Sequence, residues 1–191
     1  MNRTSKRVNQ HRRKFLKHTA LSVTAVTAAT TACSRDDAGQ LTVNRKLKIA
    51  TLDKAFDEAE RLVNANITGT DGDFNLAQTL DHCAQSIEFS IAGFPENKSA
   101  LFQRTVGSAA FHVFSWRGYM SHNLNEAIPG APALDNADTQ SALIRLDSAI
   151  ELFHQTPSAL QPHFAYGTLS KGEYEHAHAM HLANHFSAID A

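Results

Sequence analysis

Histidines near the end of the chain carry the clearest chemical signal in this sequence. His178, His181 and His185 lie within the run YEHAHAMHLANH at residues 174–185. In a helix, with about 100° of rotation per residue, the three side chains would fall within about 60° of one another, in a row that includes Tyr174. Two imidazoles four residues apart, such as His181 and His185, can bind a single metal ion.

A third ligand has to come from another part of the chain, because one helix cannot surround a metal ion. His82 is the candidate. By helical rotation it lies about 150° from the centre of the apolar stripe of its own segment, near Gln78, Gln85 and Phe89, so we do not expect it in the core. It is then either an exposed residue or one that faces a polar groove. The alternative interpretation of the whole pattern is a histidine-rich helix that binds no metal.

The first 33 residues differ in character from the rest of the chain. Of the 191 residues, 18 are basic and 19 are acidic, and seven of the basic ones fall within the first 20 positions, which contain no acidic residue. A weakly apolar run of small residues, 19–32, follows. It is shorter than the roughly 20 residues that a membrane span needs. A basic start followed by a short apolar run is typical of an export signal.

Two local motifs refine this prediction. Residues 11–17, HRRKFLK, are similar to the twin-arginine export motif, with a histidine where Ser or Thr is usual. Ala32 before Cys33 is similar to a lipoprotein processing site, although Thr30 is a poor substitute for the usual Leu. We therefore predict a twin-arginine signal peptide at residues 1–33, and a periplasmic or envelope-associated protein. Either Cys33 carries a lipid anchor or cleavage nearby releases the protein. The alternative is an ordinary basic amphipathic N-terminal helix.

Charge and cysteine content exclude two further classes. Without residues 1–33 the chain carries a net charge of −8. That charge argues against nucleic-acid binding, which needs basic patches to replace the counterions of phosphates. Cys33 and Cys83 are the only cysteines, so we do not expect a disulfide scaffold, and we interpret Cys83 as a core thiol.

Behind a polar linker at residues 34–46, apolar residues recur at the three- and four-residue spacing of helices, and no segment has the alternation of a strand. Ser170 and Glu173 fit a capping box at the start of the last helix. We expect helices at residues 47–63, 75–92, 99–120, 138–154 and from 170 to about 189.

These segments predict an all-α domain over residues 47–189. An amphipathic helix has to bury its apolar stripe against another helix, so a four-helix core with one additional helix is the most economical packing. Residues 121–137 contain Pro129, Gly130 and Pro132 and are expected to form a long loop. A loop of that length is often a lid or a binding loop, and it leaves room for a site at one end of the domain.

Several common catalytic signatures are absent. The sequence has no Gly-x-Gly-x-x-Gly, no phosphate-binding loop and no Gly-x-Ser-x-Gly elbow. His181 and His185 have the spacing of a metalloprotease pair, but Leu182 stands where the general-base Glu would be. Peptide hydrolysis by that mechanism is therefore disfavoured.

Three separated segments carry a resemblance to a known family. They are residues 80–90 (LDHCAQSIEFS), 162–170 (PHFAYGTLS) and 178–185 (HAMHLANH). In this order they resemble the DinB/YfiT-like superfamily, and more narrowly a bacterial branch of it known as a domain of unknown function. The resemblance covers nearly all of residues 47–189.

The resemblance implies a DinB-like four-helix bundle with a three-histidine metal site, and it assigns the ligands to His82, His181 and His185. The family often has a histidine at the position of Asn184, which this chain lacks. His178 competes for a ligand place, or it orients a ligand or a bound water. Three neutral imidazoles with open positions suit Zn²⁺, Ni²⁺ or Fe²⁺.

Two functional hypotheses follow. The first is an exported metal-binding bundle that acts as a metal-dependent enzyme. Its superfamily relatives include thiol transferases that use low-molecular-weight thiols, but transferring that activity rests on fold analogy alone. The second is a non-enzymatic envelope module for binding or interaction, with a vestigial metal site. Side chains of Asp81, Glu88 or Tyr174 converging on the histidines would favour the enzyme. The expected partners are the twin-arginine export machinery and a small molecule; a homodimer is left open.

Overall fold

A computed structural model of the chain describes residues 44–67, 73–134, 138–157 and 159–189. The predicted signal peptide, Cys33 and most of the predicted linker lie outside these residues. Within the described ranges the regular structure is helical, apart from one isolated antiparallel bridge between His163 and Gly167. The predicted all-α class is confirmed.

Side-chain caps mark where several helices begin. The first helix begins later than predicted, after Thr51, whose hydroxyl accepts the N–H of Lys54. The predicted capping box of Ser170 and Glu173 is present. In chain order the helices are α1 (Leu52–Asn64), α2 (Leu76–Ala92), α3 (Ala100–Phe102), the π-helical turn η1 (Gln103–Gly107), α4 (Ser108–Arg117), α5 (Thr139–Gln155) and α6 (Lys171–Ser187).

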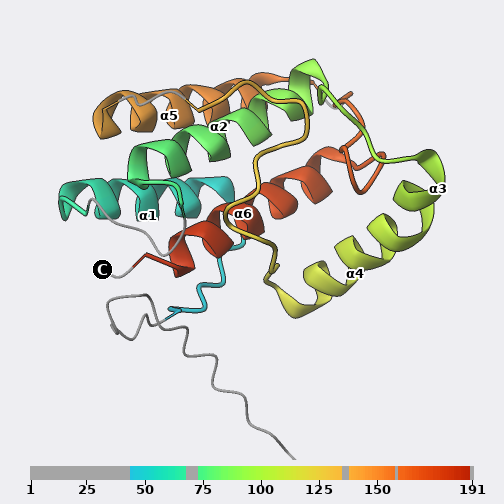
Figure 1. Cartoon of the computed structure of the whole chain (residues 1–191), viewed down its shortest axis with the longest axis horizontal. Helices are drawn as coiled ribbons and strands as arrows, with labels where there is room; N and C mark the ends of the chain where they lie inside the picture. Colours follow the sequence, from blue (N-terminus) through green and yellow to red (C-terminus); the bar gives the residue numbers. More distant parts are fainter. Residues whose placement is uncertain (1–43, 68–72, 135–137, 158, 190–191) are drawn as a thin grey trace, which may run out of the picture. The chain divides into compact units, whose positions relative to one another are not determined.

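Four of these helices form the core of the domain. α2 packs along α5, α1 packs against both α5 and α6, and α2 also contacts α6. The remaining helical segment, α3 to α4, contacts α6 only weakly and is set apart from the other four (Figure 1). This is the predicted bundle of four helices with one additional helix.

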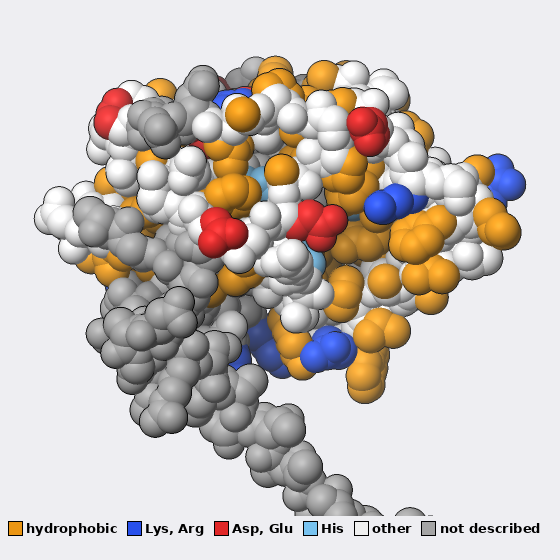
Figure 2. Space-filling model, viewed as in Figure 1, with side chains coloured by type: hydrophobic (Ala, Val, Ile, Leu, Met, Phe, Trp, Pro, Cys, Tyr) orange, Lys and Arg blue, Asp and Glu red, His pale blue; other side chains and the backbone are white. Residues whose placement is uncertain are grey.

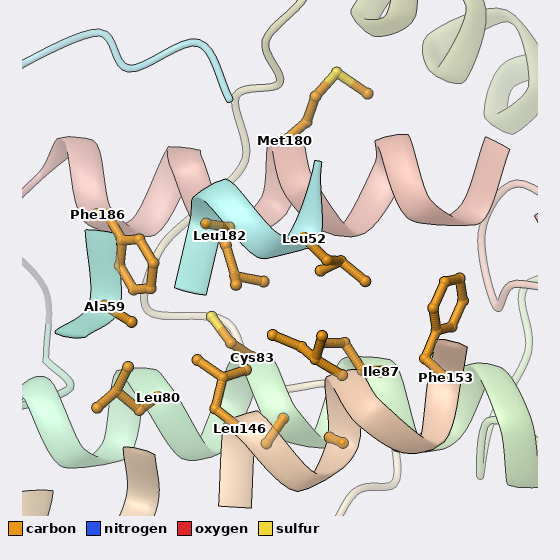
Figure 3. Packing of buried hydrophobic residues seen from close by; sticks show 14 of the residues in the cluster. Leu52, Ala59, Leu80, Cys83, Ile87, Leu146, Phe153, Met180, Leu182 and Phe186 are labelled. Atoms are coloured by element: carbon orange, nitrogen blue, oxygen red, sulfur yellow. The ribbon is translucent and has the colours of Figure 1, made fainter. Parts of the chain in front are cut away.

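The interior of the bundle is apolar. Leu182 and Phe186 of α6 lie on the side of that helix that faces α2 and α5, where Cys83, Ile87 and Leu146 lie (Figure 3). All five side chains are fully buried. Removing such surface from water is the main term that stabilises a fold of this size. Cys83 belongs to this interior, which confirms its interpretation as a core thiol, and its burial raises its pKa above the ordinary thiol range.

The segment α3–η1–α4, residues 100–117, is called the arm below. Its inner face is held closely: a Cβ on Gly107 would lie 1.8 Å from the carbonyl oxygen of Ala165. Its outer face is apolar and exposed, with Leu101 at 74% and Trp116 at 86% of their full exposure. The general expectation that an amphipathic helix buries its apolar stripe therefore does not hold for the arm. Among the described residues, none of the helices has the length and apolar character needed to cross a membrane.

Candidate metal centre

His82 and the paired histidines of α6 meet between two helices. His82 lies on α2 and is only 3% exposed, so of its two sequence interpretations the exposed residue is wrong. Its ring centroid lies 5.1 Å from that of His181 and 4.9 Å from that of His185. His82 lies outside the apolar stripe of α2, and it is buried because it faces α6.

The two histidines of α6 approach each other because four residues separate them on one helix. Their Nε2 atoms lie 3.1 Å apart, and their ring centroids lie 4.8 Å apart. One nitrogen from each of His82, His181 and His185 can be chosen so that all three lie within 4.8 Å of one another. Among the described residues this is the one group of three potential metal ligands, and it is called the cluster below.

Burial keeps the cluster neutral. It lowers the pKa of His82 to about 4, with a smaller contribution from the charge of His122. Burial and the neighbouring imidazoles hold the pKa of His181 and His185 well below the ordinary value. A neutral imidazole keeps one nitrogen lone pair for a metal. Nδ1 of His82 is buried without a hydrogen-bond partner, so the cluster contains a polar atom that a cation or its water could satisfy.

A pocket of about 230 Å³ opens beside the cluster. His82 and His181 line it, and the loop of residues 120–129 and the turn of residues 163–166 close it from the other sides. Its described lining contains no lysine or arginine, and Glu126 is its single carboxylate. The loop predicted from its length to be a binding loop is thus part of the pocket wall.

A family model described as "Protein of unknown function (DUF1569)" matches residues 41–191. The chain belongs to the DUF1569 family. Neither a curated protein nor a solved structure matches it significantly. The family match includes all four core helices, the arm and the cluster, so the geometry above is that of the DUF1569 domain itself.

Two buried histidines of the DUF1569 domain outside the cluster also line this pocket, His163 and His178, and they are called the pair below. Nδ1 of His163 accepts hydrogen bonds from the N–H groups of Ala165 and Tyr166, at 3.1 and 3.2 Å. These bonds place the ring hydrogen on Nε2. The ring stacks on that of Tyr166, with 4.2 Å between centroids and 9° between planes. Burial lowers the pKa of His163 to about 3.

His178 does not join the cluster, although the sequence made it a competitor for a ligand place. It is 1% exposed and its ring stacks on Tyr174 and meets Phe153 edge-on. Burial lowers its pKa to about 3. Its Nε2 atom is buried and has no hydrogen-bond partner in the described structure. One helical turn away from His181, it lines the pocket and is not one of the three grouped ligands.

The other side chains proposed to converge on the histidines do not reach the cluster, and the ring of Tyr174 packs on His178 instead. The hydroxyl of Tyr174 donates to the carbonyl oxygen of Gln161 at 2.6 Å. Asp81 and Glu88 both accept from the guanidinium of Arg145 on α5. Neither carboxylate lines the pocket. The cluster of this DUF1569 protein therefore has imidazoles as its neighbours instead of carboxylates.

Sequence reasoning missed one residue at the site, His122. It lies on the loop after α4, and its ring centroid is 4.9 Å from that of His181 and 5.0 Å from that of His185. No helical period points to a loop residue, so spacing could not find it. The available signal was weaker: a histidine at the start of the one long loop that was expected to be a binding loop.

Proposed function

We propose that this DUF1569 protein is an exported metal-dependent enzyme whose metal is held by His82, His181 and His185. The single observation that carries the proposal is the cluster: three neutral imidazoles from two helices, with ligand atoms within 4.8 Å of one another, at the wall of a pocket. Imidazole donors in this number suit Zn²⁺, Ni²⁺ or Fe²⁺.

The bound metal would lower the pKa of a coordinated water or thiol, or polarise a carbonyl group. The protein's own residues set the conditions for that chemistry. α2 and α6 fix the three imidazoles on packed helices, which limits their movement. The apolar lining of the pocket, with Met120, Ile128 and Tyr166, excludes water from a small substrate. Because the described lining of the pocket has no lysine or arginine, the metal is the natural binding point for a polar or anionic group of that substrate.

The resemblance to the DinB/YfiT-like superfamily supports the same proposal. It assigns ligands at the same three positions, and the helical core of the structure has the number of helices that the resemblance implies. A thiol-dependent transfer reaction, as in some of its members, would rest on fold analogy alone. The substrate class that this site supports is a small molecule that fits about 230 Å³.

Export is proposed from the sequence alone, through the twin-arginine motif at residues 11–17. This route carries folded proteins, which suits a site whose ligands come from distant helices. We expect a periplasmic or envelope-associated protein, with Cys33 as the position of a lipid anchor. Fractionation of cells that express the Arg12→Lys/Arg13→Lys variant tests this: retention in the cytoplasm is expected, and unchanged export would refute the route.

Metal analysis of the purified full chain tests the metal site. We expect close to one equivalent of a transition metal in the wild type, and less than about a tenth in His181→Ala and His185→Ala. The matched control is His176→Ala, a half-buried histidine on α6 that does not line the pocket. The proposal is wrong if the wild type also holds less than about a tenth of an equivalent and binds none on re-addition.

The non-enzymatic alternative makes a different prediction for the same variants. An interaction module with a vestigial site keeps the stability and cellular fitness of the wild type when His181 is replaced. The exposed apolar face of the arm is the observation that favours it. Wild-type fitness together with wild-type thermal stability in His181→Ala, measured with metal present, would support the module over the enzyme.

A further inference from the structure

We infer that His122 is a fourth protein ligand to the metal, supplied by the loop between α4 and α5. The inference rests on the proposed function, because it concerns the same metal. His82, His181 and His185 all lie on helices, whereas His122 lies four residues beyond Gly118, whose left-handed backbone (φ 72°) ends α4. The resting site would then hold four imidazoles instead of three.

The ring centroid of His122 lies as close to His181 and His185 as that of His82 does, although its nitrogens are not among the ligand atoms that lie within 4.8 Å of one another, so its ring has to turn toward the cluster to bind the metal. The centroid distances from His122 to His181 and His185 are 4.9 and 5.0 Å. Those from His82 to the same two rings are 5.1 and 4.9 Å. By ring-centroid distance, His82 on α2 and His122 on the loop thus approach His181 and His185 equally closely.

The hydrogen bonds of His122 orient it as a metal ligand. Its Nδ1 lies 3.1 Å from the carbonyl oxygen of Asn123, and a carbonyl can only accept, so the ring hydrogen is on Nδ1. Nδ2 of Asn184 lies 3.4 Å from the same nitrogen, and with Nδ1 protonated the amide has to be turned so that its oxygen accepts there. Nε2 is therefore left with a free lone pair. Histidine ligands commonly donate their other ring N–H to a carbonyl in this way.

The loop that carries His122 is tied to the bundle on both sides of the pocket. The side-chain oxygen of Asn125 accepts from the N–H of Asp73 at 3.0 Å, and Gln85 of α2 donates to the carbonyl oxygen of Pro132 at 3.2 Å. These bonds hold the loop over the cluster. Because His122 is exposed and lies on a loop, it is the one of the four ligands that a substrate can replace without moving a helix.

X-ray absorption of the zinc-loaded full chain counts the imidazoles directly, and zinc titration gives the affinity. We expect four imidazoles in the wild type and three in His122→Ala, with zinc affinity lower by about tenfold or more. His112→Ala, an exposed histidine of α4, is the control and should match the wild type. Circular dichroism checks that each variant is folded.

Equal imidazole counts and affinities in His122→Ala and the wild type would overturn the assignment of His122 while leaving the three-histidine site intact. Failure of the proposed function looks different, because the wild type itself would then bind no zinc. That result overturns both proposals.

A second observation, independent of the metal, concerns the outer face of the arm. Its exposed apolar side chains are one, four, seven and three residues apart, which places them on one side of the helical segment as a stripe. The stripe consists of Leu101, Phe102, Val106, Val113 and Trp116. Figure 2 shows hydrophobic side chains gathered over α3 and α4, with basic side chains among them. A stripe this large on the surface of a folded domain marks a site of interaction.

The opposite face shows that the stripe is not a core face turned outward. Gly107 lies against the backbone of Ala165, and Phe111 is buried with its ring centroid 5.6 Å from that of Tyr166. The arm is therefore docked on the domain through one face and presents the other.

Charge identifies the partner. Residues 97–125 contain Lys98, Arg104 and Arg117 and no acidic residue, although residues 34–191 carry a net charge of −8. A second copy of the arm would bring these cations against one another. Basic residues beside exposed Trp, Phe and Leu on one helix are typical of an interfacial membrane-binding helix. We propose that the arm docks on an anionic lipid surface.

Trp116 is the only tryptophan of the chain, so its fluorescence reports on the arm alone. Vesicles of phosphatidylcholine with one quarter phosphatidylglycerol should shift its emission to the blue, and vesicles of pure phosphatidylcholine should do so less. Val106→Asp/Val113→Asp should abolish the shift. Ile144→Asp/Leu152→Asp, which changes exposed apolar residues of α5, should retain it.

Binding through the basic N-terminal residues alone would sediment the protein with vesicles and leave the Trp116 emission unchanged, and that outcome overturns the proposal. A blue shift that follows protein concentration without vesicles would also overturn it, in favour of a dimer formed through the arm.

Discussion

The cluster and the pair are two sets of histidines at one pocket, and they differ in what surrounds their nitrogens. Nδ1 of His163, in the pair, accepts two backbone N–H groups, and its ring lies between aromatic neighbours. In the cluster, the nitrogens of His181 and His185 face each other at 3.1 Å, and Nδ1 of His82 has no partner. Burial lowers the pKa in both sets, so both are neutral at pH 7.

The difference indicates that His163 supports the backbone of its own turn, whereas the cluster leaves its nitrogens without backbone partners, as the proposed metal site requires. A buried polar atom without a partner costs free energy, and a fold retains such atoms where a ligand satisfies them. His163 closes the turn of residues 163–167 with its own nitrogen. The cluster has no comparable role in the backbone. His178 shares features with both sets: its ring is packed like that of His163, while its Nε2 is left unpaired like Nδ1 of His82.

Acid should produce the largest effect. In the unfolded chain a histidine takes up a proton near pH 6.5, whereas His163 and His178 do so only near pH 3. Between these values the unfolded state binds more protons, so the free energy of unfolding falls as the pH falls, by about 1.4 kcal/mol per pH unit for each histidine. From pH 6 to pH 4 the pair alone removes about 5 kcal/mol, which is comparable to the whole stability of many domains.

Urea unfolding in the presence of a chelator, from pH 7 down to pH 4.5, measures this loss without a contribution from metal. In His163→Phe/His178→Phe the unfolded state should bind about two fewer protons relative to the folded state, so the free energy of unfolding should fall less steeply with pH. An unchanged slope in that variant would mean that the pair is not held neutral, and the comparison with the cluster would lose its basis.

Gly107→Ala tests how tightly the backbone turn that carries His163 is held against the arm. The new Cβ would lie 1.8 Å from the carbonyl oxygen and 2.9 Å from the carbonyl carbon of Ala165, so the turn of residues 163–167 or the arm has to move. We expect a loss of about 2–3 kcal/mol in urea unfolding, because neither backbone can give way easily. Zinc affinity should stay within about threefold, since the cluster is supported by α2 and α6.

Gly172→Ala is the matched control for this change. Gly172 lies in α6, and a Cβ there meets nothing within 4 Å. Alanine should stabilise the helix by up to about 1 kcal/mol. If both substitutions stabilise the protein, the close approach of Gly107 to Ala165 is wrong.

The all-α fold could be predicted from the sequence because its helices carry local signals. The capping box of Ser170 and Glu173 fixed the start of α6, and apolar periodicity identified α2 and α5 to within one or two residues. The meeting of His181 with His185 follows from helical geometry alone. The approach of His82 does not: spacing left it open, and only the resemblance to a family selected it. Its role as a ligand remains a prediction.

The features that could not be predicted depend on contacts between distant segments. Periodicity marked the stripe of the arm as apolar but could not say that Gly107 and Phe111, on the other face, would be the ones to pack. His122 reaches the cluster through the path of a loop, which is set by bonds such as that between Asn125 and Asp73. The structural role of His163 depends on the turn of its own chain, for which histidine is not a typical signal.

His163→Phe should lower the stability moderately and leave the zinc content unchanged, which would show that the pair and the cluster have different roles. Phenylalanine keeps the ring that stacks on Tyr166, and it removes the acceptor for the N–H groups of Ala165 and Tyr166. Leaving these groups unpaired should cost about 1–3 kcal/mol in urea unfolding. The exposed histidine of α5, in His154→Phe, is the control and should change stability by less than about 0.5 kcal/mol. Zinc content equal to that of the wild type is expected, and its loss would mean that His163 belongs with the cluster.

Ser170→Ala should have the smallest effect on stability. Because α6 carries members of both the cluster and the pair, this variant tests whether the start of the helix influences metal binding. The hydroxyl of Ser170 caps α6 through the N–H of Glu173, and its loss should cost about 1 kcal/mol in urea unfolding. Asp138→Ala removes the equivalent cap of α5, which carries neither set, and should cost a similar amount. Both variants should bind zinc as the wild type does, since His181 lies three turns from the cap and is held by packing against α2. A drop of more than about tenfold in zinc affinity for Ser170→Ala alone would mean that the start of α6 positions the cluster.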